Sequence, residues 1–168
     1  MNDLQRWDRA VKAADGTYDA LPAETRTGLD TLIGQIMGLK EELVERVLMA
    51  GSASICRTCS GQCCRNGKYH VTVLDLLAYR RSGTEPVVPD FSASPACPYS
   101  GASGCRMPPR FRPLTCVVFN CELVEEMLGP DERTALYAGE RLLRGATAQA
   151  NRLAGQRLDR ALLLWCDP

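Results

Sequence analysis

The chain has 168 residues, of which 45% are hydrophobic and 24% are charged, and its formal net charge is zero. This length and composition are typical of one globular domain, and the zero charge gives no general attraction to nucleic acid or to an anionic membrane surface. The opening residues are polar and mixed in charge, and no run approaches the roughly 18 apolar residues that would span a bilayer. We therefore expect a cytoplasmic protein without an export signal or a membrane anchor, whose thiols stay reduced.

The first part of the chain, residues 1–51, has the periodicity of helices. A short helix is expected at residues 4–14, followed by one long amphipathic helix over residues 25–50. The capping-box spacing of Thr27 and Asp30 would place the start of the long helix slightly later. The apolar stripe of this helix consists of Leu29, Leu32, Ile33, Ile36, Met37, Leu43, Val44, Val47 and Leu48.

The middle part, residues 56–121, contains seven of the ten prolines and shows little amphipathic pattern. A short helix is expected over residues 73–81 and a short strand over residues 69–73. A proline-rich stretch of this length is typical of disorder or of a functional loop. The cysteines spaced through it indicate another solution, in which bound metal ions hold the segment together.

The last part, residues 122–168, is expected to be helical again. A short helix over residues 121–128 precedes a longer one that begins at Pro130, where acidic residues follow in the first turn, and Gly155 separates this from a final helix. The three parts together predict a single, mainly α domain: a helical scaffold around an irregular insert rich in cysteine and proline, with at most a short strand or two. Its C-terminal apolar residues are Leu136, Leu143 and Leu153, expected to pack on the first stripe, and Leu158, Leu162 and Leu163 of the final helix.

Nine cysteines are many for a reduced compartment, and eight of them lie in the middle part of the chain. Cysteine clusters in such a compartment are more often metal-binding or redox-active than structural disulfides. Soft thiolate ligands favour zinc, an iron–sulfur cluster or Cu(I), and eight sulfurs suffice for two four-sulfur sites or for one cluster with spare thiols. The eight are Cys56, Cys59, Cys63, Cys64, Cys97, Cys105, Cys116 and Cys121.

Cys56 and Cys59 form a C-x-x-C turn, which aims two thiolates at one point. Such a turn is the usual first half of a tetrahedral sulfur site and is also a spacing of iron–sulfur ligands. Thioredoxin-like redox motifs share it, but they belong to a strand–helix context, whereas here a predicted helix precedes the motif and Cys63 and Cys64 follow. Metal binding is therefore favoured over a dithiol redox motif.

Cys63 and Cys64 are adjacent in the sequence. Consecutive side chains of an extended chain point to opposite sides, so that chelation of one metal by both would need an awkward small ring. We expect the two thiols to serve different metal atoms or different corners of the site.

The middle part of the chain contains eight basic and three acidic residues, a net charge of +5 that the rest of the chain balances. Nearby cations lower thiol pKa values and favour ligation. The alternatives are that these side chains bind a phosphate-bearing partner or lie in solvent. The basic run over residues 106–112 is short for a nucleic-acid patch, and no nucleic acid is expected.

The cysteine pattern resembles the YkgJ-type cysteine-cluster family. The elements that carry the resemblance, in chain order, are C-x-x-C-x3-C-C, Cys97-Pro98, Cys105 and the element R-P-L-T-C that ends at Cys116. That family is described as a zinc- or iron-chelating domain and includes flagellin lysine N-methylase. The resemblance covers residues 56 to about 121 and implies a metal site that uses all eight cysteines named above. The methylases are larger, and 168 residues leave little room for a separate fold that binds S-adenosylmethionine.

Three further residues carry weaker signals. His70, the only histidine, is interpreted as an ordinary strand residue rather than as a ligand or proton carrier, because the thiols suffice for ligation. Asp75 is expected to cap or brace the helix after the cluster, with a catalytic base as the less favoured role. Cys166 is expected to be a buried, inert thiol. The sequence has no G-x-S-x-G, G-x-G-x-x-G or P-loop motif, so neither a hydrolase triad nor nucleotide binding is supported.

The leading hypothesis is a cytoplasmic iron–sulfur protein, with a [4Fe–4S] cluster favoured, that transfers electrons or modifies a partner in a redox-linked step. The first alternative is a structural zinc module that serves protein interaction. The second, which depends on the family resemblance, is an enzyme that modifies protein side chains, such as a lysine N-methylase. We expect a protein partner, no membrane and no nucleic acid.

Overall fold

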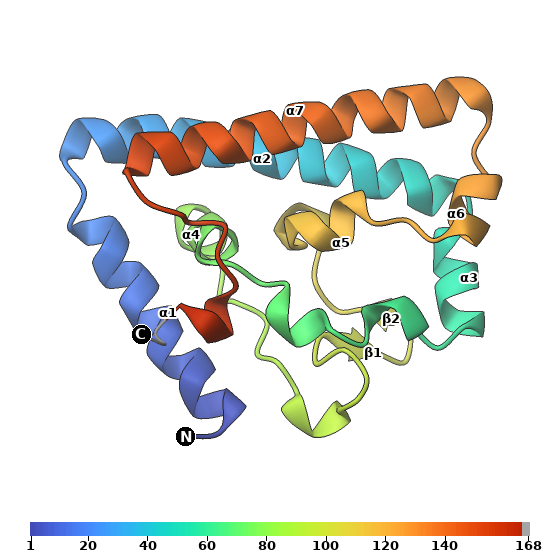
Figure 1. Ribbon diagram of the computed structural model, residues 1–168, viewed down its shortest axis with the longest axis horizontal. Coiled ribbons are helices and arrows are strands. Elements are labelled where there is room, and N and C mark those ends of the chain that lie inside the picture. The colour runs from blue at the N-terminus through green and yellow to red at the C-terminus, as the bar shows by residue number, and fades with distance from the viewer. Residues whose placement is uncertain (166–168) are drawn as a thin grey trace.

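The computed structural model describes residues 1–165, and within them no helix is both long and apolar enough to cross a membrane. Two long helices, α2 (Ala23–Met49) and α7 (Pro130–Ala154), run antiparallel along one side of the molecule (Figure 1). Helix α1 (Asp3–Asp19) extends from one end of this pair and α3 (Ser52–Thr58) from the other. The mainly α fold predicted from the sequence is confirmed.

The space beneath the long pair is filled by short elements (Figure 1). The remaining α-helices are α4 (Val73–Ser82), α5 (Leu114–Val118) and α6 (Glu122–Glu126). In the part of the chain that the structure describes, the only sheet is an antiparallel pair, β1 (Ser100–Gly101) and β2 (Gly104–Cys105). The 3₁₀ helices are η1 (Gln62–Cys64), η2 (Gly67–Tyr69), η3 (Phe91–Ala93), η4 (Pro109–Phe111) and η5 (Leu162–Leu164).

The stripes predicted on the two long helices form the centre of the core. Because each buried leucine or isoleucine side chain contributes about 1.5–3 kcal/mol relative to exposure, this seam stabilises the whole scaffold. The close approach of the two helices depends on Gly139, where a Cβ atom would stand 2.7 Å from Leu43 Cδ2. Leu153 is 40% exposed, and its side chain lies over Gly28 of α2, where an added Cβ would be 3.0 Å from Leu153 Cδ2. The buried stripe residues are Leu29, Leu32, Ile33, Ile36, Met37, Leu43, Val44 and Val47 of α2, and Leu136 and Leu143 of α7.

The long helix α2 begins earlier than the capping-box spacing indicates. Its first residue is Ala23, directly after Pro22. The Thr27 hydroxyl does not cap the helix but donates to the Ala23 carbonyl from inside the first turns. Asp30 accepts hydrogen bonds from the Tyr18 hydroxyl of α1 instead, at 2.8 and 2.9 Å. The carboxylate therefore ties α2 to α1 rather than capping α2.

Two further local predictions are wrong for one common reason. Residues 69–73 do not form a strand, because Tyr69 ends η2 and Thr72 already caps α4. The expected final helix shortens to the single turn of η5. The backbone groups of these two segments bond to each other: Leu162 N–H donates to the Val71 carbonyl and Leu74 N–H to the Leu158 carbonyl, and Thr72 forms an isolated β-bridge with Ala161. Long-range pairing therefore replaces both predicted local structures.

The cysteine-bearing insert packs into the same core as the helices around it. Every residue of α4 from Val73 to Tyr79 is buried. The Tyr79 ring stacks on Phe111 from η4, with centroids 4.0 Å apart. The central part of the insert is therefore held by apolar packing, whether or not metal ions hold its cysteine-bearing ends.

Three of the eight basic residues of the insert form ion pairs with acidic residues of the flanking helices. Several of its basic side chains form ion pairs with carboxylates on α1 and α2, so the charge difference between the two parts of the chain joins them. Each such exposed pair contributes only about 0–1 kcal/mol. The pairs are Arg80 with Asp15 and Asp19, Arg110 with Glu41, and Lys68 with Asp3.

Candidate metal centre

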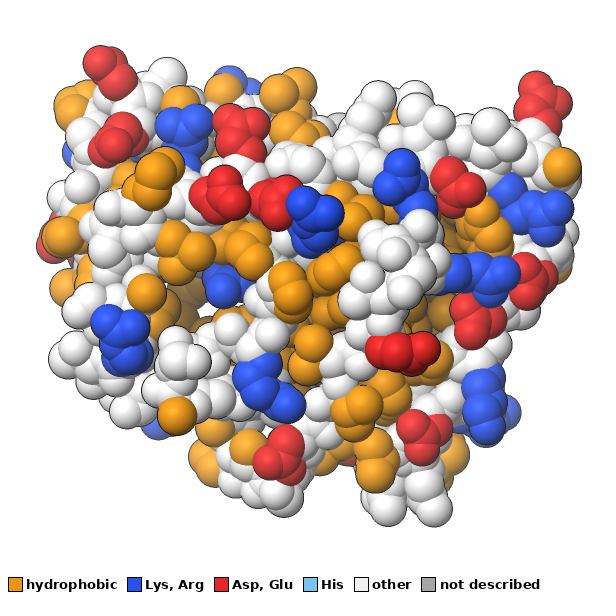
Figure 2. Space-filling view, turned by 180° about the vertical axis from the view of Figure 1, so that it is seen from behind, with side chains coloured by type: hydrophobic (Ala, Val, Ile, Leu, Met, Phe, Trp, Pro, Cys, Tyr) orange, Lys and Arg blue, Asp and Glu red, His pale blue; other side chains and the backbone are white. Residues whose placement is uncertain are grey.

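One cavity of about 550 Å³ collects most of the clustered cysteines. It lies among α3, η1, the β1–β2 hairpin, α5 and α6, and the view from behind shows the molecule hollowed on the side where these elements lie (Figure 2). All eight clustered cysteines are free thiols. Cys59 does not line the cavity, and its thiol approaches the Cys56 carbonyl oxygen at 3.6 Å. The seven that do line it are Cys56, Cys63, Cys64, Cys97, Cys105, Cys116 and Cys121.

A tight turn after α3 brings the first four cysteines together. Ser60 and Gly61 both adopt left-handed backbone conformations, with φ of 53° and 68°. Gly61 N–H donates back to the Cys56 carbonyl at 3.3 Å, which closes the end of α3. The left-handed region suits glycine because it has no Cβ, so Gly61 lets the chain reverse and carry η1 back against α3.

The adjacent pair does not have the geometry that the sequence analysis assumed. Cys63 and Cys64 lie in the 3₁₀ helix η1, not in an extended chain, and their Sγ atoms are 3.9 Å apart. The expectation that the two side chains point to opposite sides is therefore wrong. In a tetrahedral thiolate site with metal–sulfur bonds of about 2.3 Å, two ligand sulfurs lie about 3.8 Å apart. The spacing of this pair thus matches two corners of one such site.

His70 is the residue whose role the sequence analysis missed. It follows η2 rather than lying in a strand, and its Nδ1 is 3.3 Å from Cys116 Sγ. Burial lowers the pKa of this half-buried imidazole, which favours the neutral ring. With a proton on Nδ1 the neutral ring donates to the sulfur of a thiol or a thiolate, and without one Nδ1 accepts from the S–H of a thiol. In the sequence, the only indication that His70 lies near the thiols was its position six residues after Cys64.

Cys97 occupies a place that only a glycine neighbour permits. A Cβ atom at Gly67 would overlap Cys97 Sγ and would lie 3.0 Å from its Cβ. The backbone of Gly67 is not left-handed, so the requirement is for space and not for conformation. The bare Gly67 backbone therefore sets how closely η2 and Cys97 approach.

We expect Gly67→Ala to lower the free energy of unfolding by about 1–3 kcal/mol, because the added methyl group must displace Cys97. Gly145→Ala is the control: a Cβ there meets nothing within 4 Å, and alanine in the middle of α7 should raise the free energy of unfolding by up to about 1 kcal/mol. Urea unfolding followed by circular dichroism measures both. A Gly67→Ala protein as stable as the Gly145→Ala protein would contradict the tight contact.

Four of the partly buried thiols have raised pKa values, which favours their protonated form. Desolvation raises the pKa of Cys56, Cys97 and Cys116, and that of Cys64 to about 12. The charges of neighbouring thiols raise these pKa values further, because thiolates in one cavity repel one another. The thiols that act on Cys56 are Cys63, Cys59 and Cys121, and those that act on Cys116 are Cys105, Cys97 and Cys64. The thiols thus form two groups, one around Cys56 that includes Cys63 and one around Cys116 that includes Cys64.

Within residues 1–165, no three His, Cys, Asp or Glu side chains converge closely enough to hold a metal ion as they stand. The thiols nevertheless share one cavity. Cysteine ligands lose their protons when a metal binds, so deprotonation of these thiols and formation of a metal site would be coupled.

Two other side chains suit the cavity to an anionic centre. Arg112 lines it, and the guanidinium charge lowers the pKa of Cys56 against the larger effect of burial. Asn120 also lines it, and its buried Nδ2 has no hydrogen-bond partner in the described part of the chain. An orphaned amide N–H donor beside thiols is the kind of group that hydrogen-bonds a ligated sulfur. No motif in the sequence identified Asn120.

The remaining predictions have mixed outcomes. Asp75 caps α4 in a capping box with Thr72, as expected. Cys166 lies outside the described residues. Comparisons of the chain with protein-family models, with curated proteins and with solved structures found no match.

Proposed function

We propose that this protein binds a metal centre through its clustered cysteines, with an iron–sulfur cluster of the [4Fe–4S] type as the favoured occupant. The observation that carries the proposal is the gathering of seven free thiols around one cavity of about 550 Å³. Soft thiolate ligands select zinc, Cu(I) or iron–sulfur clusters over magnesium or calcium. The resemblance of the cysteine spacing to the YkgJ-type family supports the same assignment. We also propose a cytoplasmic location, where cysteines stay reduced and available as ligands.

The protein residues around the cavity fit a negatively charged centre. The thiolates would supply the ligands, Asn120 has a free N–H donor for a sulfur atom, and Arg112 would offset part of the negative charge. An iron–sulfur cluster held here would supply one-electron redox chemistry, at a potential set by hydrogen bonds to sulfur and by exposure to solvent. We accordingly propose a redox role, either electron transfer or redox-linked modification of a partner.

The surface beside the cavity supports a protein partner. Phe119, which lines the cavity, Leu123 of α6 and Met127 at the C-terminal end of α6 are each 57% exposed. Leu123 and Met127 lie one helical turn apart, and Phe119 precedes them in the extended segment between α5 and α6. Exposed large apolar side chains that cluster in this way are typical of protein interaction surfaces. A partner bound there would lie against the cavity wall.

A structural zinc module is the second candidate. The 3.9 Å separation of Cys63 Sγ and Cys64 Sγ favours it, because it matches an edge of a tetrahedral thiolate site. In that case the metal would fix η1 against α3, and the exposed side chains of Phe119, Leu123 and Met127 would carry the function by binding a partner. The third candidate, a lysine N-methylase or related enzyme, depends on the family resemblance.

The deciding experiment measures iron, zinc and acid-labile sulfide in protein purified without oxygen. Iron with an equal amount of sulfide, together with visible absorption, is the result expected for an iron–sulfur cluster. Zinc at one or two atoms per chain with no sulfide would favour the structural module. Protein that contains neither metal, and takes up neither after reconstitution, would overturn the proposal.

A further inference from the structure

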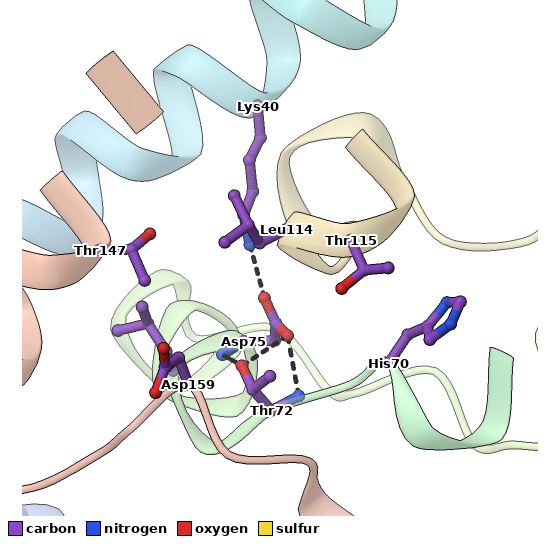
Figure 3. Close-up of a pocket in the computed structure, with 9 residues that line it drawn as sticks. Lys40, His70, Thr72, Asp75, Leu114, Thr115, Thr147 and Asp159 are labelled. Atoms are coloured by element: carbon purple, nitrogen blue, oxygen red, sulfur yellow. Dashed lines mark hydrogen bonds and ion pairs between the residues drawn. The ribbon is translucent and has the colours of Figure 1, made fainter. Parts of the chain in front are cut away.

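A second, smaller cavity of about 170 Å³ lies at the centre of the molecule, away from most of the cysteines. Side chains from α2, α4, α5 and α7 and from the C-terminal segment converge on it (Figure 3). Unlike the cysteine cavity, its lining is rich in charged and hydroxyl groups. It includes Lys40, Asp75, Thr115, Thr147 and Asp159. Polar cavities of this kind hold either ordered water or a polar ligand.

Lys40 and Asp75 form a buried ion pair at the middle of this cavity. Each is at most 2% exposed, and Lys40 Nζ lies 2.5 Å from Asp75 Oδ1. The other carboxylate oxygen, Oδ2, accepts from both the N–H and the hydroxyl of Thr72. Both oxygens of Asp75 are therefore occupied. An ammonium group has three N–H donors, and two of those on Lys40 have no acceptor among the described residues.

Thr147 is a second buried group that lacks a partner. It is 4% exposed on α7, and its Oγ1 has no hydrogen bond within residues 1–165. A threonine inside a helix usually donates to the carbonyl four residues earlier, so an orphan hydroxyl here is unusual. Leaving such a group unsatisfied costs about 1–3 kcal/mol. Lys40 and Thr147 together present unused donors to the cavity.

Asp159 gives the cavity an acidic end. Figure 3 shows it on the same side of the ion pair as Thr147, with Thr115 and His70 on the opposite side. Its Oδ1 accepts from Arg157 at 3.2 Å, but that arginine is 79% exposed and contributes little in water. The three charges that line the cavity are therefore one ammonium and two carboxylates. The lining has a net charge of −1, so a free anion is disfavoured and an ammonium group is favoured beside Asp159. A carboxylate in the same molecule could accept from the donors of Lys40 and Thr147 that have no protein acceptor.

The volume limits the size of the occupant. At about 30 Å³ for each water molecule, the cavity of about 170 Å³ has room for about five or six water molecules, and so for a small organic molecule of at least as many non-hydrogen atoms. Glycine and alanine are zwitterions of this size. Their carboxylate accepts the hydrogen bonds that Lys40 and Thr147 offer, and their ammonium group donates to Asp159.

We propose that this cavity is a binding site for a small zwitterionic α-amino acid, held by Lys40 and Thr147 at its carboxylate end and by Asp159 at its ammonium end. The site does not depend on the metal proposal, because none of these three residues lines the cysteine cavity. The two cavities share His70 and Thr115, so the bound amino acid would lie next to the candidate metal centre.

Isothermal titration calorimetry of the full chain with glycine and L-alanine tests the site, at ligand concentrations up to the order of 10 mM, since so few atoms limit the affinity. Acetate and methylammonium serve as the two half-molecules. We expect both amino acids to bind and each half-molecule to bind at least about tenfold more weakly, because it leaves one end of the site unpaired. A cavity filled by water alone would give no heat with any of the four compounds and would overturn the proposal, as would acetate or methylammonium binding as tightly as glycine.

Two variants locate the binding. Thr147→Val keeps the shape of the side chain and removes the hydroxyl, and Asp159→Asn removes the charge of the acidic end. Each should weaken glycine binding at least about tenfold. Thr31→Val is the matched control, since Thr31 is an exposed threonine on α2 that bonds only its own helix. Glycine binding that is unchanged in Thr147→Val and Asp159→Asn would place the ligand elsewhere, and urea unfolding of each variant verifies that it is folded.

Discussion

Replacement of Lys40 by methionine is expected to lower the free energy of unfolding by about 3–5 kcal/mol, because it leaves the carboxylate of Asp75 buried without its counter-charge. The ammonium and the carboxylate are both at most 2% exposed, so bulk solvent cannot replace the lost counter-charge. Methionine has nearly the same length and leaves little cavity, which isolates the electrostatic effect. Urea unfolding monitored by circular dichroism gives the free energies.

Two comparisons make this prediction specific to the buried pair. The double variant Lys40→Met with Asp75→Asn should recover a large part of the loss, since asparagine is uncharged and its carbonyl can still accept from Thr72 N–H. Lys68→Met removes the ammonium from an ion pair with Asp3 whose side chains are 36% and 32% exposed, and should cost less than about 1 kcal/mol. If Lys40→Met and Lys68→Met had equal effects, the pair would not be the buried tie between α2 and α4 described here.

Replacement of Cys116 or Cys59 by serine is expected to reduce the metal content per chain to less than half that of the wild-type protein. Cys116 lies in the wall of the cysteine cavity, and serine oxygen is a poor substitute for a soft thiolate ligand. Cys59 provides the sharper test, because its thiol is turned toward the Cys56 carbonyl rather than lining the cavity. Its loss of metal would show that the thiol reorients on binding, as coupled folding and ligation require.

The control for these variants is Cys166→Ser, since Cys166 is the one cysteine outside the cluster in the sequence. It should retain the metal content and the free energy of unfolding of the wild-type protein. Elemental analysis of the three proteins, purified in parallel without oxygen, measures the effect. Equal metal content in all three would refute the assignment of Cys59 and Cys116 as ligands.

The elements that the sequence predicted best are those whose signal is local and repeated. The stripe on residues 25–50 and the start of the last long helix at Pro130 both appear in α2 and α7. Many residues contribute to each of these patterns, so a buried face is specified many times over. The short segments have too few residues for such redundancy. Residues 69–73 and 158–164 therefore adopted the structure set by their mutual backbone pairing.

Seven of the eight cysteines that the sequence groups together line one cavity in the structure, and their role as ligands stays a prediction. The number and spacing of the thiols predict a metal site, because clustered cysteines in a reducing compartment are more often ligands than structural disulfides. The orientation of Cys63 and Cys64 was misjudged, since it depends on the 3₁₀ turn of η1 and not on their adjacency. Asn120 could not be identified from the sequence, because an asparagine that belongs to no motif can be assigned a role only from the groups around it in the fold.

By itself the sequence determined the helical class, the buried faces of the two long helices and the identity of the thiol ligands we propose. Each of these follows from residue type and local spacing. The tertiary structure alone decided that Lys40 meets Asp75 across 35 residues and that His70 meets Cys116 across 46. Lysine within an apolar stripe has to find a buried partner, but no local rule names which carboxylate it will be. The packing of the insert beneath α2 and α7 decides which carboxylate pairs with Lys40. The same packing brings together the residues of both candidate sites.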